Sequence, residues 1–203
     1  MNRAIITHGH SDHARAGHNH VLATPQTIEI MKARYGRNCA NHFQPLNYGQ
    51  PLRFGGVEIT LFPAGHILGS AQVCVEYKGQ RAVVTGDYKI VADSSAQHFE
   101  LVRCDLLVTE ATFGLPVFQH PQPAEEIKKL LASLAKNSDR PHVIGAYALG
   151  KSQRVIKLLR EAGYEEPIYL HGAQERLCEY YQSQGVDLGL SLIHISEPTR
   201  QSL

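Results

Sequence analysis

Residues 3–13 read Arg-Ala-Ile-Ile-Thr-His-Gly-His-Ser-Asp-His, a short apolar run followed at once by a cluster of polar side chains. The run Arg3–Thr7 has the length and the branched side chains of a buried strand. Imidazole and carboxylate groups are good zinc ligands, and a chain leaving a strand can direct alternate side chains toward one point. So many ligands in so short a stretch suit two adjacent metal ions better than one closed site. The candidate ligands are His8, His10, Asp12 and His13.

Two later segments each place one polar side chain after a predicted strand. His66 follows the strand predicted at Val57–Phe62, and Asp87 follows the strand predicted at Arg81–Thr85. Glycines next to both residues allow the backbone to approach a site closely. Because all these residues lie at the C-terminal ends of strands, we expect them to meet at one place.

The pattern of predicted elements changes along the chain. Residues 1–114 are rich in strands, and residues 115–189 alternate helices and strands, with a Pro-containing boundary at Leu115–Pro123. The remaining predicted strands are Ala71–Tyr77, Asp105–Thr109, His142–Ala146 and Ile168–His171. The predicted helices are Thr27–Tyr35 with a threonine cap, Ala124–Lys136, Ser152–Ala162 and Gln174–Gln184.

Residues 190–203 form a tail of different character. Leu190–Arg200, LSLIHISEPTR, resembles the translated sequence of a transposon-type sequencing adapter, residue for residue. We therefore expect a tail that is not native, on a natural sequence cut near Gly189. The alternative is an ordinary polar tail.

Composition excludes some classes of protein. The 203 residues carry a formal net charge of only +1, so a nucleic-acid-binding surface would have to be local rather than global. The 4 cysteines are scattered without a CxxC pair, and no apolar run is long enough to span a bilayer. These features predict a cytoplasmic protein without membrane partners.

The motifs together resemble a known family. HxHxDH, a GH after one strand and a GDY after another are similar to the metallo-β-lactamase superfamily. Glu110, in TEATFG, resembles the acidic residue that opens the β-CASP insertion of the nucleic-acid-processing branch. The runs GDYK, TEATFGLPVF, YALGKSQR and LHGA are similar to bacterial DNA-ligase-associated exonucleases (mRNA 3′-end processing factor-like), and the resemblance covers residues 3–189.

The resemblance implies an α/β (α+β) fold and a set of metal ligands. The fold would be an αββα sandwich, incomplete at the N-terminus, in residues 1–114, with the start of a β-CASP α/β cap in residues 115–189. Two Zn²⁺ would activate a water for attack on phosphorus. The first zinc would be held by His8, His10 and His66, and the second by Asp12 and His13, with Asp87 bridging. Asp12, Asp87 and Glu110 are the implied catalytic residues.

Two departures from the family matter for activity. Its members have a β-hairpin region before the first strand and carry later histidines, which complete the second zinc site and assist proton transfer. No residue before Gly189 matches these later histidines, and His194 lies in the adapter-like tail. We therefore expect this fragment to hold metal weakly and to be inactive by itself, although the gene would encode an enzyme.

A second motif competes with the first. Gly145–Ser152 matches the phosphate-binding pattern GxxxxGK[ST] between a predicted strand and a helix, which is the alternative of a P-loop NTPase. The next strand, Ile168–His171, ends in His-Gly and lacks the acid that such enzymes use for magnesium. A third interpretation is that Lys151 and Arg154 contact the phosphates of a nucleic acid.

The function predicted is a zinc-dependent phosphodiester hydrolase, specifically a DNA exonuclease of end processing or repair. Its partner would be DNA rather than RNA, with a functional link to DNA ligase. Three alternatives stay open besides the NTPase: an RNA-processing β-CASP nuclease, a small-molecule hydrolase such as a thioesterase or lactamase, and a non-catalytic metal-binding scaffold.

Overall fold

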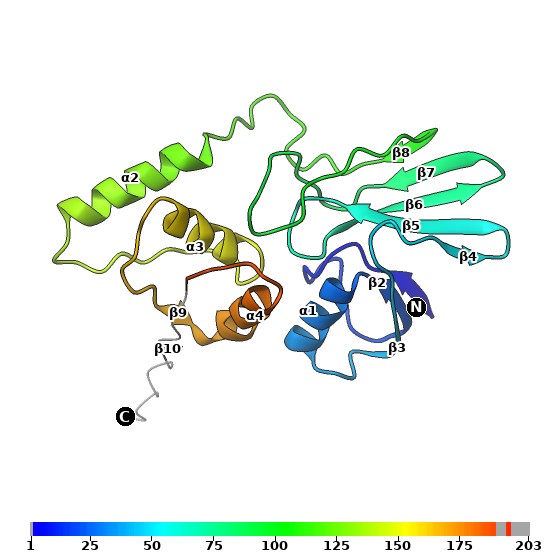
Figure 1. Cartoon of the computed structure of the whole chain (residues 1–203), viewed down its shortest axis with the longest axis horizontal. Coiled ribbons are helices and arrows are strands. Elements are labelled where there is room, and N and C mark those ends of the chain that lie inside the picture. The colour runs from blue at the N-terminus through cyan, green and yellow to red at the C-terminus, as the bar shows by residue number, and fades with distance from the viewer. Residues whose placement is uncertain (1, 190–193, 196–203) are drawn as a thin grey trace. The chain divides into compact units, whose positions relative to one another are not determined.

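A computed structural model describes residues 2–189 and the pair His194–Ile195. The chain forms two compact units, Met1–Thr112 and Phe113–Leu203, which Figure 1 colours in sequence order. Among the described residues, no helix combines the length and the apolar character needed to cross a bilayer. Apart from His194 and Ile195, the predicted adapter-derived tail lies outside the described residues.

The first unit contains two sheets, so the predicted mixed α/β class is confirmed. A parallel sheet has the order β1-β2-β3, and a second sheet has the order β4-β5-β6-β7-β8. The second sheet is antiparallel except for the parallel pair β7–β8. The strands are β1 (Arg3–Ile5), β2 (His18–Ala23), β3 (Ala40–Pro45), β4 (Leu52–Phe54), β5 (Val57–Pro63), β6 (Ala71–Tyr77), β7 (Gln80–Val84) and β8 (Leu106–Val108).

The helix of this unit, α1 (Pro25–Tyr35), begins two residues before the predicted start. Its cap is Thr24, not Thr27, because the Thr24 hydroxyl accepts a hydrogen bond from the Thr27 N–H over 3.2 Å. Pro25 at the first helical position and Gly36 after the last complete the boundaries.

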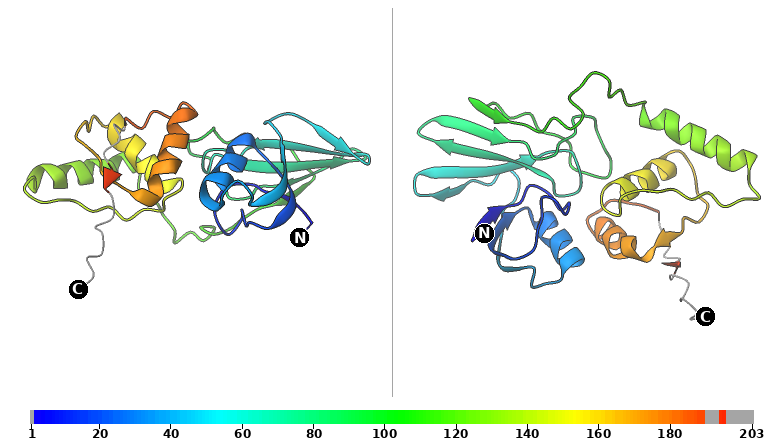
Figure 2. Two further views of the ribbon diagram at one scale, coloured as in Figure 1. Left: turned by 90° about the horizontal axis from the view of Figure 1, so that it is seen from below. Right: turned by 180° about the vertical axis from the view of Figure 1, so that it is seen from behind.

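Two apolar clusters hold the layers together. One cluster packs α1 against the parallel sheet through Ile28, Met31, Val21 and Ala23. The other joins the two sheets through Leu22 of β2, Leu61 of β5 and Val73 of β6. The layers are therefore α1, the parallel sheet and the five-stranded sheet, and Figures 1 and 2 show α1 beside β2 and β3.

Two strands predicted to be buried are exposed at sheet edges. In β8, Leu106, Leu107 and Val108 are 59%, 54% and 51% exposed, and in β1 Ile5 is 38% exposed. Each strand has a neighbour on only one side. The predicted burial was wrong for β8, because an apolar run can also form an edge strand, whereas in the strand predicted at Arg3–Thr7 Ile6 is buried in the first cluster.

The described part of the second unit contains three helices, α2 (Pro123–Lys136), α3 (Lys151–Glu161) and α4 (Gly172–Ser183), each within two residues of its predicted start. A two-residue strand, β9 (Leu170–His171), pairs in parallel with β10 (His194–Ile195). The strand predicted at His142–Ala146 does not form. Val143 is 94% exposed, and a single extended segment without a hydrogen-bonded neighbour is no strand.

Candidate metal centre

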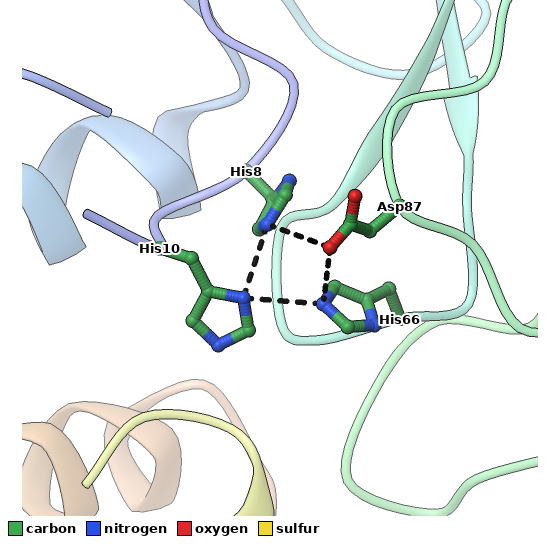
Figure 3. Close-up of side chains that lie close together, drawn as sticks. All are labelled: His8, His10, His66 and Asp87. Carbon is green, nitrogen blue, oxygen red and sulfur yellow. Dashed lines mark hydrogen bonds and ion pairs between the residues drawn. The ribbon is translucent and has the colours of Figure 1, made fainter. Parts of the chain in front are cut away.

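Three segments that leave the ends of strands supply the polar side chains of one cluster. His8 and His10 follow β1, His66 follows β5, and Asp87 follows β7. One ligand atom from each residue lies within 4.8 Å of the others. The structure thus brings together residues separated by up to 79 positions in sequence, as Figure 3 shows.

Four of the six distances between the ligand atoms lie between 3.0 and 3.7 Å. His10 Nδ1 lies 3.0 Å from His8 Nε2 and 3.2 Å from His66 Nε2. Asp87 Oδ2 lies 3.7 Å from His8 Nε2 and 3.6 Å from His66 Nε2. A tetrahedral zinc with bonds of about 2.0–2.1 Å has ligand–ligand edges of about 3.3–3.4 Å. The four distances lie on either side of this value, so three imidazole nitrogens and one carboxylate oxygen could hold one metal ion here.

The second oxygen of Asp87 faces His13, which in turn lies next to Asp12. His13 Nε2 lies 3.3 Å from Asp87 Oδ1 and 3.6 Å from Asp12 Oδ2. Asp12 and His13 are outside the cluster of four: His13 adjoins it through Asp87, and Asp12, whose side chain is 73% exposed, contacts His13. Asp87 therefore has one oxygen toward each of two groups of ligands.

One helical turn places His13 beside His8. After β1 the chain closes through a hydrogen bond of 2.7 Å from the Ala14 N–H to the His10 carbonyl, at the start of the predicted helical turn. The rings of His8 and His13 consequently lie 4.2 Å apart between centroids. One loop with the HxHxDH spacing thus supplies His8 and His10 to the cluster of four and Asp12 and His13 beside it.

Burial keeps two of the histidines in the form that binds metal. Burial, with the nearby His66, His13 and His10, lowers the pKa of His8 to about 2. Burial and the neighbouring His10 lower the pKa of His66 to about 4, although Asp87 opposes the shift. Both imidazoles are therefore neutral near pH 7, and a neutral imidazole has a nitrogen lone pair for a metal.

The loop that carries His66 is held by hydrogen bonds on both sides. The buried Ser70 hydroxyl accepts from the His66 N–H over 3.1 Å and from the Ile67 N–H over 3.2 Å. The hydroxyls of Thr24 and Thr27, at the start of α1, donate to the Gly69 carbonyl over 2.7 and 2.9 Å. Helix α1 therefore fixes the loop that carries His66.

The loops of His66 and Asp87 are also bonded to each other. The Lys89 N–H donates to the Ala64 carbonyl over 2.9 Å. At Gly65, a Cβ would lie 2.2 Å from the Lys89 carbonyl oxygen, and φ is +74°. Only glycine permits this approach, which keeps His66 and Asp87 at a constant separation.

Glu110 follows β8 and is not one of the four clustered residues. Its Oε2 accepts from the Thr112 N–H over 2.9 Å. Burial raises the pKa of Glu110, but hydrogen bonds from Thr112 and from the Tyr88 backbone outweigh it, so the pKa lies below its usual value. Glu110 is therefore a charged acceptor that holds its own loop and the residue after Asp87.

The GxxxxGK[ST] segment of the second unit does not form a phosphate cradle. The Ser152 hydroxyl donates to the Tyr147 carbonyl over 2.8 Å, and the Gly150 N–H donates to Gln153 Oε1 over 2.7 Å. Ser152 and Gln153 are buried. In a P-loop these donors point at phosphate, whereas here they form hydrogen bonds with other groups of the protein. The geometry therefore argues against the NTPase alternative. Lys151 is exposed and Arg154 half-buried at the start of α3.

A contact that the sequence did not suggest lies beside the first ligands. Arg34, in the last turn of α1, donates from Nη1 to the Gly9 carbonyl over 2.6 Å. A basic residue near a helix C-terminus is common, so no local signal in the sequence pointed to this contact.

Comparison with known proteins agrees with this geometry. A family model described as "Beta-lactamase superfamily domain" matches residues 2–137. The chain belongs to the metallo-β-lactamase superfamily. The superfamily's α/β sandwich accounts for the two packed sheets and α1.

Relatives of this metallo-β-lactamase chain include proteins named as nucleases. It is 31% identical over 187 residues, 91% of the chain and 18% of the relative, to "Probable DNA ligase" of Opitutus terrae. It is 29% identical over 145 residues to "Cleavage and polyadenylation specificity factor subunit 3" of Dictyostelium discoideum (66% of the chain, 18% of the relative). It is 28% identical over 178 residues to "Endoribonuclease YSH1" of Gibberella zeae (82% and 21%). The last two are β-CASP proteins, and the chain spans about a fifth of each relative's length.

Proposed function

We propose that the chain is part of a two-zinc phosphodiesterase that shortens DNA from an end, in end processing or repair. The observation that carries this proposal is the position of Asp87 between two groups of ligands. His8, His10 and His66 would hold one Zn²⁺, and Asp12 and His13 the other, with Asp87 contributing an oxygen to each. When bound, two such ions supply Lewis acidity and lower the pKa of a shared water.

The chain's own residues supply position and charge. The neutral His8 and His66 offer nitrogen lone pairs, while Asp87 and Asp12 supply negative charge to offset that of the ions. The hydrogen bonds of Ser70, Gly69 and Ala64 hold the His66 segment in place. The charged Glu110 supports the site from the end of β8, next to the segment that carries Asp87. Each side chain is thus ready to bind without large rearrangement.

The preference for DNA is supported by the Opitutus terrae relative. The segment similar to this chain is 18% of a protein named "Probable DNA ligase". Two activities in one polypeptide commonly act on one substrate, and a ligase requires ends of a suitable structure. We therefore propose DNA ends as the substrate and a functional link to a DNA ligase.

Metal content tests the site. Zinc would be measured by elemental analysis in the 203-residue chain, in Asp87→Ala, and in Asp139→Ala as a control for loss of an exposed carboxylate. We expect wild type and control to hold zinc weakly, up to two ions per chain, and Asp87→Ala to hold clearly less. Equal zinc in all three proteins, or none in any, would contradict the proposed site.

Substrate class is tested on the completed gene. End-labelled DNA and RNA of one base sequence would be incubated with zinc and without ATP, using Asp87→Ala as the inactive control. We expect stepwise shortening of DNA, and loss of that activity in Asp87→Ala. Faster degradation of RNA would reject the DNA proposal.

One alternative has support of its own. The relatives named for endoribonuclease and polyadenylation functions match over much of this chain, and a zinc site does not by itself distinguish sugars. This second candidate predicts internal cuts in RNA, which the same labelled substrates would reveal as fragments of intermediate length.

A further inference from the structure

Thr7 contacts all three segments that carry the ligands. It immediately precedes His8, and its carbonyl oxygen accepts from the Ala71 N–H over 2.7 Å, at the end of the His66 loop. Its Cβ lies 2.7 Å from the position that a Cβ on Gly86 would occupy. The residue before Asp87 therefore passes directly over the Thr7 side chain.

The Thr7 hydroxyl lies next to one histidine from each group of ligands. Oγ1 is 3.2 Å from His8 Nδ1 and 3.5 Å from His13 Nδ1. The other nitrogen, Nε2, of each ring faces Asp87. An imidazole that gives its Nε2 lone pair to a metal carries its proton on Nδ1. A hydroxyl oxygen has two lone pairs and can accept from both Nδ1–H groups.

We propose that Thr7 is a positioning residue that sets the tautomer and ring orientation of His8 and His13 together, and so prepares both ion sites. This inference rests on the proposed metal binding. Partners of this kind, which bond the far nitrogen of a ligating histidine, raise metal affinity by orienting the ring. Thr7 differs from the usual case because one oxygen serves ligands of two ions.

The Thr7 side chain packs closely against Gly86. Threonine is restricted about χ1 by its branched Cβ, and the Gly86 backbone packs against that branch. Gly86 has φ of +56°, and the nearest Thr7 atoms would lie 2.7–3.0 Å from an added Cβ. The Gly86 backbone thereby limits the rotation that would turn Oγ1 away from the two histidines.

The test compares Thr7→Val, which replaces the hydroxyl with a methyl of similar size, with Thr7→Ser, which keeps it. Thr60→Val in β5 is the control for the same change elsewhere in the unit. Zinc affinity would be measured by competition with a chromophoric chelator, and Co²⁺ absorption would report ligand geometry. We expect Thr7→Val to bind zinc roughly 10–100-fold more weakly with an altered Co²⁺ spectrum. Thr7→Ser and Thr60→Val should resemble wild type.

The outcomes separate this inference from the proposed function. If wild type and Thr7→Val bind zinc equally and give the same Co²⁺ spectrum, the role of Thr7 is overturned while the metal site stands. If wild type binds no metal, both proposals fail. Should Thr7→Val unfold, Thr7→Ser and Thr7→Ala provide the comparison, since both lack the methyl and differ in the hydroxyl. Equal zinc affinity in that pair would also overturn the inference.

Discussion

Arg34 donates a hydrogen bond of 2.6 Å from Nη1 to the carbonyl oxygen of Gly9, between the first two metal-site histidines. The contact joins the last turn of α1 to the loop after β1. The charged Arg34 side chain is exposed, whereas Gly9 is buried, so we expect the bond to contribute about 1–2 kcal/mol. Helix α1 therefore contacts the site at both ends, through Thr24 and Thr27 at one and Arg34 at the other.

Arg34→Met should loosen the loop of His8 and His10. We expect a loss of about 1–2 kcal/mol in unfolding free energy and a drop of roughly tenfold in zinc affinity. Urea unfolding and chelator competition would measure them. Arg37→Met, an exposed arginine just after the helix, is the control. Matching values for the two variants would show that the Gly9 contact has no role.

Gly65→Ala should be far more disruptive than the same change at Gly49. Both glycines have positive φ, +74° and +70°, so alanine costs about 1–2 kcal/mol of backbone strain at either. At Gly65 the new Cβ would also lie 2.2 Å from the Lys89 carbonyl, whereas at Gly49 nothing lies within 4 Å. We expect an additional loss of about 1–3 kcal/mol at Gly65. Thermal and urea unfolding of both variants would test this, and similar losses would exclude the close contact.

Asp93 should make stability depend on pH at the acid end. Burial raises its pKa, but Lys89 and Ser95 more than compensate, so the folded pKa lies below the usual value. Its contribution is therefore complete above the usual carboxyl pKa and is lost as pH falls through the folded pKa.

Asp93→Asn should cost about 1–3 kcal/mol at pH 7, because it weakens a buried ion pair with Lys89. The difference from wild type should shrink as the pH falls below the usual carboxyl range. Urea unfolding across this range would measure it, with the exposed Asp139→Asn as control. A difference that does not change with pH would contradict the assignment.

Lys151→Ala, made in the completed protein, tests the proposed contact of α3 with nucleic-acid phosphates. Loss of one phosphate contact should reduce the slope of log affinity against log salt by about 0.7–0.9. Lys128→Ala is the matched control, because Lys128 pairs with Glu125 on the exposed face of α2. An unchanged slope and affinity would remove Lys151 from the binding surface.

The sequence predicted strands β1, β5, β6, β7 and β8 but missed β2, β3 and β4. Strands β5, β6 and β7 alternate or run apolar, and turn residues bound them, so their pattern is local. Strand β2 was missed because His18, Asn19 and His20 make its first half polar, and β3 because its sequence, ANHFQP, has little apolar content. Both form because the parallel neighbour and α1 cover their apolar side chains, which is tertiary information.

In the candidate site, too, local sequence predicted some features and tertiary packing determined the others. The structure clusters His8, His10, His66 and Asp87, which the sequence analysis had placed at the ends of strands. The supporting contacts of Arg34, Ser70 and Thr24 could not be predicted, because each depends on how a helix or loop packs against a strand distant in sequence. Residue type and spacing identified the cluster, and only the tertiary structure identified what holds it.

The two oxygens of Asp87, one toward His8 and His66 and the other toward His13, make the two proposed ions thermodynamically dependent on each other. An ion bound to one oxygen orients the carboxylate for the second ion, which favours binding of that ion. The same ion also neutralises part of the carboxylate's negative charge, which disfavours it. Whichever effect is larger, linkage requires each ion to change the affinity of the other by the same factor. Both positions would therefore fill as zinc supply rises, over a narrower range of zinc concentration if the coupling is favourable and over a wider range if it is unfavourable.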